Sequence, residues 1–246
     1  MNLRRFISLL PIALAIANCF VTESRSATRP ARPKLACATI GNVVLEFPSA
    51  YQFFPLSYEG IDYWRGEASK QWEKGCRDRA SQIALSTSWP DLKPPDKRFY
   101  ETSRDPDLIS IVLDANKAKD PSAALEKIRN YHISPDSKPA TDEVSRQYRA
   151  REFPFDKSLG LFKSGPIQTR ARYQKLTYWS VNDEKKIEIL ILCELYRTGS
   201  MTCDEMRFSK RIDVWITVKF RGPLLPEWRE MARESESLIN NFIKKD

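Results

Sequence analysis

The residues of this sequence best suited to chemistry are its cysteines, and two of them, Cys193 and Cys203, enclose the stretch CELYRTGSMTC. Two cysteines at this spacing could bind a metal ion, form a redox-active pair or join the strands of a hairpin through a disulfide. A structural zinc site takes four Cys or His ligands, whereas this chain has one histidine and no second close pair of cysteines. A redox pair more often has the spacing C-x-x-C at the start of a helix. The spacing therefore favours a disulfide across a hairpin.

A hairpin register centred on Thr198 brings the two cysteines together. In this register Cys193 lies directly opposite Cys203, and residues 197–199 form a three-residue loop. Such loops commonly end with a residue in the left-handed conformation, which Gly199 adopts at little cost. Opposed residues of an antiparallel pair lie ~4.5–5.5 Å apart at Cα, within the range of a disulfide. The same register pairs Glu194 with Thr202, Leu195 with Met201 and Tyr196 with Ser200.

The N-terminus indicates which compartment the chain occupies. Two arginines in MNLRR precede the apolar run FISLLPIALAIA, which is shorter than the ~20 residues of a membrane span and typical of a secretory signal. We expect residues 1–26 to be a signal peptide, with cleavage after Ala17 or after Ser26. A lipid anchor at Cys19 is the alternative, and Asn18 disfavours it because a small residue normally precedes a lipidated cysteine.

The remaining cysteines fit an oxidising compartment. Four lie beyond the signal, and an even number in an exported chain favours disulfides. If Cys193 pairs with Cys203, then Cys37 pairs with Cys76 by elimination, although four cysteines allow three connectivities. We therefore predict a disulfide-bonded protein of the periplasm.

The elements that position these cysteines are mainly strands. In the first half, IGNVVLEF (40–47), SQIALSTSW (81–89) and DLISIVLDA (107–115) predict strands. The stretch PSAALEKIRNY predicts a helix with Asp120 as its N-cap and Pro121 at its first position.

The second half predicts further strands at KLTYWSV (175–181), KIEILILCELY (186–196) and RIDVWITVKF (211–220). Residues 187–196 are apolar on both faces apart from Glu188 and Glu194, so we expect this strand to be central in its sheet. The last strand places five apolar residues on one face: Ile212, Val214, Ile216, Val218 and Phe220. A C-terminal helix follows, and its apolar stripe consists of Trp228, Met231, Leu238, Ile239, Phe242 and Ile243.

These elements predict an α+β fold, with antiparallel sheet and with the C-terminal helix packed on it. Each half has its strands first and a helix last, which suggests two similar halves. The polar, proline-containing residues 135–157 are expected to link an N-terminal lobe, residues 27–134, to a C-terminal lobe, residues 158–246.

The sequence holds little that could carry out catalysis. His132 is the only histidine, and we expect it as a cap or surface residue at the end of a helix, where the dipole favours a cation. No G-x-S-x-G motif accompanies it, no glycine-rich phosphate loop is present, and Asp105 and Asp107 lie in a turn-like segment typical of solvated carboxylates. We therefore predict that the chain is not an enzyme and needs no cofactor or metal, and a hydrolase using His132 is the minority hypothesis.

Charge and aromatic residues indicate binding instead. The chain has a net charge of +8, and arginines gather around tyrosines in its middle, a composition common at protein-recognition sites. A solvated basic face is the alternative interpretation. Nucleic acid is excluded as a partner outside the cytoplasm, whereas an acidic protein surface or anionic lipid would attract this charge. The predicted partner-binding residues are Arg146, Tyr148, Arg149, Arg151, Arg170, Arg172 and Tyr173.

Four segments resemble a known family. The cysteine-containing strand pair, the strand RIDVWITVKF and the stretch GPLLPEWREMARESESLINNFI are similar to the C-terminal end of exported immunity proteins that accompany type VI secretion lipase effectors. VVLEFPSAY resembles a segment near the start of that group. The resemblance implies an α+β fold and a periplasmic inhibitor that occludes the active site of a toxin. A cationic envelope factor that binds membrane or cell-wall polymer is the alternative function.

Overall fold

The structure is a computed structural model of the chain. It describes residues 34–61, 65–66, 70, 73–95, 105–134, 152–169 and 173–245. The predicted signal peptide, residues 1–26, and Cys19 lie outside these ranges and stay predictions. Among the described residues no helix is both long and apolar enough to span a membrane.

The described strands form one large sheet and one separate hairpin. The sheet has nine strands within the described part of the chain, in the order β3-β4-β5-β11-β10-β9-β8-β7-β6, and β1 pairs with β2 in the hairpin. All neighbouring strands of both sheets run antiparallel. The strand bounds are β1 Leu35–Ile40, β2 Val43–Pro48, β3 Ser57–Tyr58, β4 Ala80–Ser88, β5 Leu108–Ala115, β6 Phe155–Asp156, β7 Leu161–Gln168, β8 Tyr173–Val181, β9 Ile187–Tyr196, β10 Met201–Ser209 and β11 Val214–Arg221.

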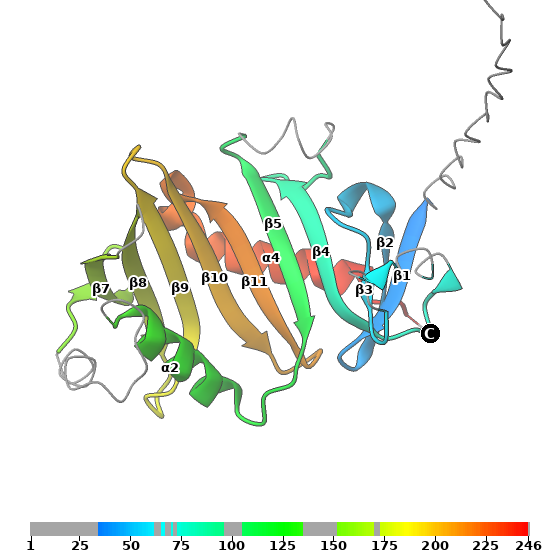
Figure 1. The fold of residues 1–246 in the computed structure, drawn as a ribbon, viewed down its shortest axis with the longest axis horizontal. Coiled ribbons are helices and arrows are strands. Elements are labelled where there is room, and N and C mark those ends of the chain that lie inside the picture. The colour runs from blue at the N-terminus through cyan, green and yellow to red at the C-terminus, as the bar shows by residue number, and fades with distance from the viewer. Residues whose placement is uncertain are drawn as a thin grey trace, which may run out of the picture. The chain divides into compact units, whose positions relative to one another are not determined.

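Two α-helices of the described chain cover opposite faces of the sheet. Helix α2, Pro121–His132, lies over β8, β9 and β10, whereas α4, Trp228–Phe242, crosses the other face (Figure 1). Short 3₁₀ turns, η1 Ser49–Tyr51 and η5 Gly222–Glu227, connect the elements. The antiparallel sheet with a C-terminal helix on it confirms the predicted α+β class.

Both expected lobes contribute strands to the large sheet. Strand β5 of the first segment pairs with β11 of the second from Ser110↔Lys219 to Ala115↔Val214. Strand β9 lies between β8 and β10, inside the sheet as predicted. The division into residues 27–134 and 158–246 stays a prediction, since most of the expected linker, residues 135–151, lies outside the described ranges.

The hairpin β9–β10 has the register that its sequence predicts. Cys193 lies opposite Cys203, and the two form a disulfide with their Cα atoms 4.1 Å apart. The Tyr196 N–H donates to the Ser200 carbonyl at 2.9 Å, and Gly199 closes the loop at φ 82°. The pairing of Cys37 with Cys76 is also confirmed, with 4.6 Å between their Cα atoms.

The first strand prediction was wrong, because residues 40–47 do not form one strand. Strands β1 and β2 meet at a two-residue turn, Gly41 and Asn42, which places Ile40 opposite Val43. Gly41 has φ 56°, and a Cβ there would overlap the Ile212 carbonyl oxygen of the β10–β11 turn. Glycine therefore serves both the hairpin turn and the close approach of a second turn.

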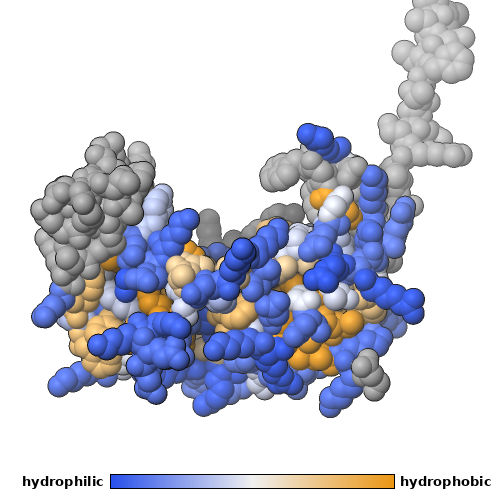
Figure 2. Space-filling model, turned by 90° about the horizontal axis from the view of Figure 1, so that it is seen from below, coloured by the Kyte–Doolittle hydropathy of each residue, from blue (hydrophilic) through white to orange (hydrophobic). Residues whose placement is uncertain are grey.

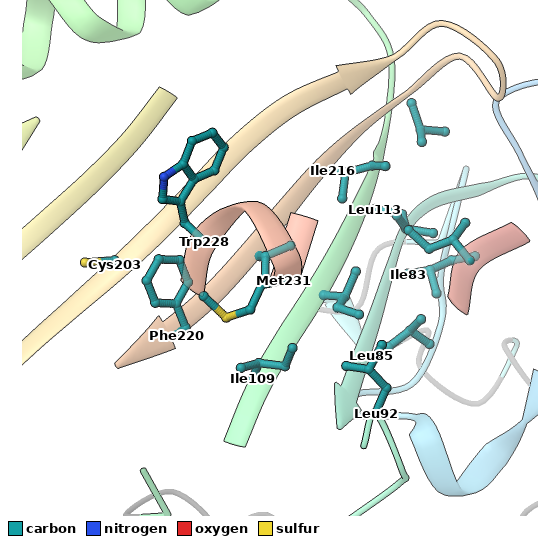
Figure 3. Close-up of a cluster of buried hydrophobic side chains, with 14 of the residues drawn as sticks. Ile83, Leu85, Leu92, Ile109, Leu113, Cys203, Ile216, Phe220, Trp228 and Met231 are labelled. Carbon is teal, nitrogen blue, oxygen red and sulfur yellow. The ribbon is translucent and has the colours of Figure 1, made fainter. Parts of the chain in front are cut away.

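The main core lies between the sheet and α4. All five predicted apolar residues of the β11 face are buried, and so are Trp228, Met231 and Ile239 of α4. Figure 3 shows Trp228 and Met231 beside Phe220 of β11. The indole N–H of Trp228 donates to the Leu159 carbonyl at 3.1 Å, which satisfies its polar atom inside the core.

A smaller core lies under α2 on the other face. The helix begins as predicted, with the Asp120 carboxylate accepting from the Ala123 N–H at 3.1 Å and with Pro121 in the first position. Leu125 packs with Trp179 of β8 and Leu190 of β9. This packing sets where the C-terminal turn of α2 meets the sheet.

Candidate protein-binding surface

His132 lies beside a hydroxyl, an arrangement that could activate a nucleophile. Its Nδ1 is 2.7 Å from Oγ1 of Thr177. Thr177 is 0% exposed, so its hydroxyl does not face solvent. Burial, with a smaller effect of Lys175, lowers the pKa of His132 from 6.5 to about 4. This corrects the expected cationic cap: His132 does end α2, but it is neutral and packed against β8.

Other candidate reactive or metal-binding groups among the described residues already have partners. Among the described residues, one group could hold a metal ion by its spacing. It consists of Cys37, Glu46 and Cys76, whose possible ligand atoms lie within 4.8 Å of one another. Both sulfurs belong to a disulfide, so they offer no thiolate, and the Glu46 carboxylate forms an ion pair with the Lys244 ammonium at 3.2 Å. Asp105 lies in an exposed turn, where its carboxylate accepts from the backbone of Asp107 at 3.0 Å, as expected for a loop residue.

Three tyrosines gather where α2 ends over the sheet, and we name Tyr131, Tyr173 and Tyr196 the tyrosine cluster. Tyr173 of β8 lies opposite Tyr196 of β9, with 5.8 Å between the ring centroids. Tyr131 extends from the last turn of α2 and is 56% exposed. The cluster therefore combines residues from three elements on one face of the sheet.

Two charged residues lie within the tyrosine cluster. Lys175 and Glu194 are direct cross-strand partners, and Lys175 is only 4% exposed. The Lys175 ammonium lies 5.5 Å from the centroid of the Tyr131 ring, a cation–π distance. The Tyr196 hydroxyl donates to Glu194 at 2.6 Å. The Tyr196 hydroxyl and the Lys175 ammonium are therefore both held by neighbours on this surface.

Both phenols that face Glu194 stay protonated at neutral pH. Burial is the main cause of the raised pKa of Tyr173, and the Glu194 carboxylate adds to it. The hydrogen bond to Glu194 is the main cause of the raised pKa of Tyr196, and burial adds to it. Both rings therefore remain neutral donors, a state suited to contacts with a protein partner.

A small pocket of about 150 Å³ adjoins the cluster at the end of β8 and β9. Its wall combines amides, phenols and one guanidinium, so it is suited to polar side chains of a partner. The lining residues are Gln168, Tyr173, Gln174, Leu195, Tyr196 and Arg197.

Of the partner-binding residues predicted from the sequence, Tyr173 is described, and it is half-buried within the cluster. The other six, Arg146, Tyr148, Arg149, Arg151, Arg170 and Arg172, lie outside the described residues, and their role stays a prediction. Sequence reasoning missed Tyr131, Lys175 and Glu194. The register of β8 with β9 places Lys175 opposite Glu194. That register could not be predicted, because the turn between these strands has no signal comparable to the cysteine spacing and Gly199 of the next hairpin.

The opposite end of the sheet has a different character. Figure 2 views this end, where the β8–β9 and β10–β11 turns lie, and it shows mainly hydrophilic residues with small, separate apolar patches. Charges of both signs lie there. Lys186 forms an ion pair with Glu184 at 2.8 Å and is the main cause of the lowered pKa of that carboxyl, to which Lys210 adds a smaller electrostatic effect. Because both signs of charge are present, this end of the sheet is not the uniform basic face that the net charge of the whole chain suggests.

Comparison with known proteins connects the chain to one solved fold. No protein-family model matches the chain, and no curated protein matches it in sequence. Its fold is similar to that of an immunity protein of the Stenotrophomonas maltophilia type IV secretion system, with a TM-score of 0.55 and 15% sequence identity. The match covers 89% of this chain and 100% of that chain. At this identity the similarity shows a shared fold.

Proposed function

We propose that this chain is a periplasmic immunity protein, which neutralises a toxic effector enzyme by binding it and occluding its active site. The observation that carries the proposal is the fold shared with a secretion-system immunity protein over the full length of that protein. The chain itself acts as an inhibitor rather than as an enzyme in this proposal.

The two disulfides support the export that this role requires. Cys37–Cys76 and Cys193–Cys203 join cysteines as the sequence predicts for an oxidising compartment. The tyrosine cluster and Arg197 support the binding role, because Tyr and Arg are enriched at the centres of protein interfaces. We propose that the other six residues predicted from the sequence widen this surface: Arg146, Tyr148, Arg149, Arg151, Arg170 and Arg172.

The class of effector is a finer part of the proposal. The sequence resemblance points to a lipase delivered by a type VI system, whereas the structural neighbour belongs to a type IV system. Both connect the chain with immunity proteins of secretion systems. We propose an envelope-degrading effector, with a lipase as the first class to test.

The proposal is tested with the purified protein encoded by the gene beside that of this chain. The effector's lipase activity on phospholipid vesicles is measured with and without the chain. We expect inhibition that is complete near one chain per effector, and protection from that effector in cells that export the chain. Full activity at a large excess of the chain, together with no measurable binding, would contradict the proposal.

The net charge of +8 favours a second candidate function, a cationic envelope factor. It predicts binding to anionic vesicles or to cell-wall polymer in the absence of any effector, with a strong dependence on salt. Sedimentation with vesicles that contain or lack anionic lipid distinguishes it from an inhibitor, which should remain in the supernatant.

A further inference from the structure

The tip of the β9–β10 hairpin, residues 197–200, extends past the strands on both sides. The pairing of β9 with β8 ends at Tyr196↔Tyr173, and that of β10 with β11 ends at Thr202↔Arg221. Residues 197–200 are all exposed, and a Cβ added at Gly199 would have nothing within 4 Å. Figure 1 shows the hairpin projecting from the sheet.

A disulfide and contacts within the loop hold the tip in one conformation. The disulfide joins Cys193, four residues before Arg197, to Cys203, three residues after Ser200, and these cysteines are 0% and 1% exposed. The Gly199 N–H donates to the Tyr196 carbonyl at 2.9 Å, and the hydroxyls of Thr198 and Ser200 lie 2.9 Å apart. A loop that is ordered before binding loses less entropy when a partner encloses it.

The tip carries one cation. Arg197 is exposed and forms no ion pair with any residue that the structure describes. Its guanidinium is planar and can bind a carboxylate through two parallel hydrogen bonds. Tyr196 and Tyr173 line the pocket at its base, so aromatic contacts are available beside the charge.

We propose that this tip enters a concave cleft of the effector, where Arg197 pairs with a carboxylate on the cleft wall. The disulfide between Cys193 and Cys203 holds the tip in the conformation that binds. This inference rests on the proposed immunity function and specifies its binding element. The partner it fits is an enzyme with an acidic cleft, and the tyrosine cluster beside the tip is the supporting contact.

The charge is tested by titrating R197A, R197K and R197E against the purified protein encoded by the neighbouring gene. We expect R197A to bind about tenfold or more weakly, R197K to recover part of the loss and R197E to bind worst. R211A is the matched control, because Arg211 is an exposed arginine in the turn at the other end of β10. It should bind like the unchanged chain.

The disulfide is tested by comparing C193A/C203A with C37A/C76A at a temperature where circular dichroism shows both variants folded. We expect weaker binding only in C193A/C203A, because the second disulfide lies away from the tip, between β1 and residue 76. Equal affinities of these two variants would overturn the role of the disulfide.

The outcomes separate this inference from the function on which it rests. If the unchanged chain binds and inhibits the effector while R197A and R197E bind equally well, the tip is not the inserted element and the immunity function stands. If the unchanged chain neither binds nor inhibits, the proposed function fails first. Loss of binding in R211A to the same extent as in R197A would also overturn the inference.

Discussion

The imidazole Nδ1 of His132 lies 2.7 Å from the hydroxyl oxygen of Thr177 and ties the last turn of α2 to β8. Burial favours the neutral ring, and the nearby Lys175 adds to this, which lowers the pKa of His132 from 6.5 to about 4. A contact that depends on a neutral histidine makes the stability of the protein sensitive to acid.

We predict that stability falls as the pH drops from 6.5 towards 4. The unfolded chain binds a proton at His132 near pH 6.5 and the folded chain only near pH 4, so the stabilisation is complete above 6.5 and is lost across this window. The loss is at most about 3.5 kcal/mol, at ~1.4 kcal/mol for each pKa unit. Urea denaturation at a series of pH values measures it. H132Q should have a flatter profile in this window, and an equally steep profile would assign the loss to other groups.

The two disulfides should differ in their resistance to reduction. Cys37 and Cys76 are half-buried, whereas Cys193 and Cys203 are almost fully enclosed. A thiol reductant must reach a sulfur atom to attack it, so we expect Cys37–Cys76 to open first in the native protein. Alkylation and mass spectrometry after increasing doses of dithiothreitol give the order. Simultaneous opening would show that reduction follows global unfolding.

Two glycines allow a steric effect to be separated from a conformational one. Gly199 and Gly41 both have positive φ, 82° and 56°. A Cβ at Gly199 meets open space, whereas one at Gly41 meets the backbone of the β10–β11 turn. We predict that G199A costs about 1–2 kcal/mol from the left-handed conformation alone and that G41A costs more. Denaturant titration measures both, and equal costs would contradict the close packing of the two turns.

The parts of the fold that the sequence predicts are those fixed by local chemistry. The β9–β10 register follows from the cysteine spacing and from Gly199, because few registers satisfy both. The start of α2 follows from Asp120 and Pro121, whose capping and fixed φ act within one turn. The β1–β2 hairpin was missed because Gly41 and Asn42 interrupt an apolar run only briefly, and the reason for glycine there is a contact with a distant turn.

The candidate site depends on contacts between distant segments. Tyr131 joins Tyr173 and Tyr196 only because α2 docks on β8 and β9, and that docking uses Leu125 and other core residues rather than the cluster. His132 shows the same limit, since its place at a helix end is local but its burial is tertiary. Residue types predicted Tyr173 as a binding residue, which stays a prediction, and they did not specify its neighbours.

The buried ion pair under α4 should be costly to break. Arg207 donates to Glu205 and, at 2.7 Å, to the carbonyl of Ala232, and both side chains are buried. R207A leaves a carboxylate without its cation in the core, which we expect to cost about 3–5 kcal/mol. The double variant E205L/R207M removes both charges at similar volume and should cost less. Thermal and urea denaturation compare the two, and a smaller loss in R207A than in the double variant would contradict this account.

The tyrosine cluster should matter for binding and little for folding. Tyr131 is 56% exposed, so Y131A should leave the melting temperature nearly unchanged, while it removes a large aromatic contact from the proposed interface. We expect binding to the effector to weaken about tenfold, ~1.4 kcal/mol, mainly through faster dissociation. F54A is the matched control, because Phe54 is 53% exposed but lies between η1 and β3, and β3 is the opposite edge strand of the sheet. Surface plasmon resonance measures both variants. A loss of affinity in F54A with none in Y131A would move the interface from the tyrosine cluster to that edge.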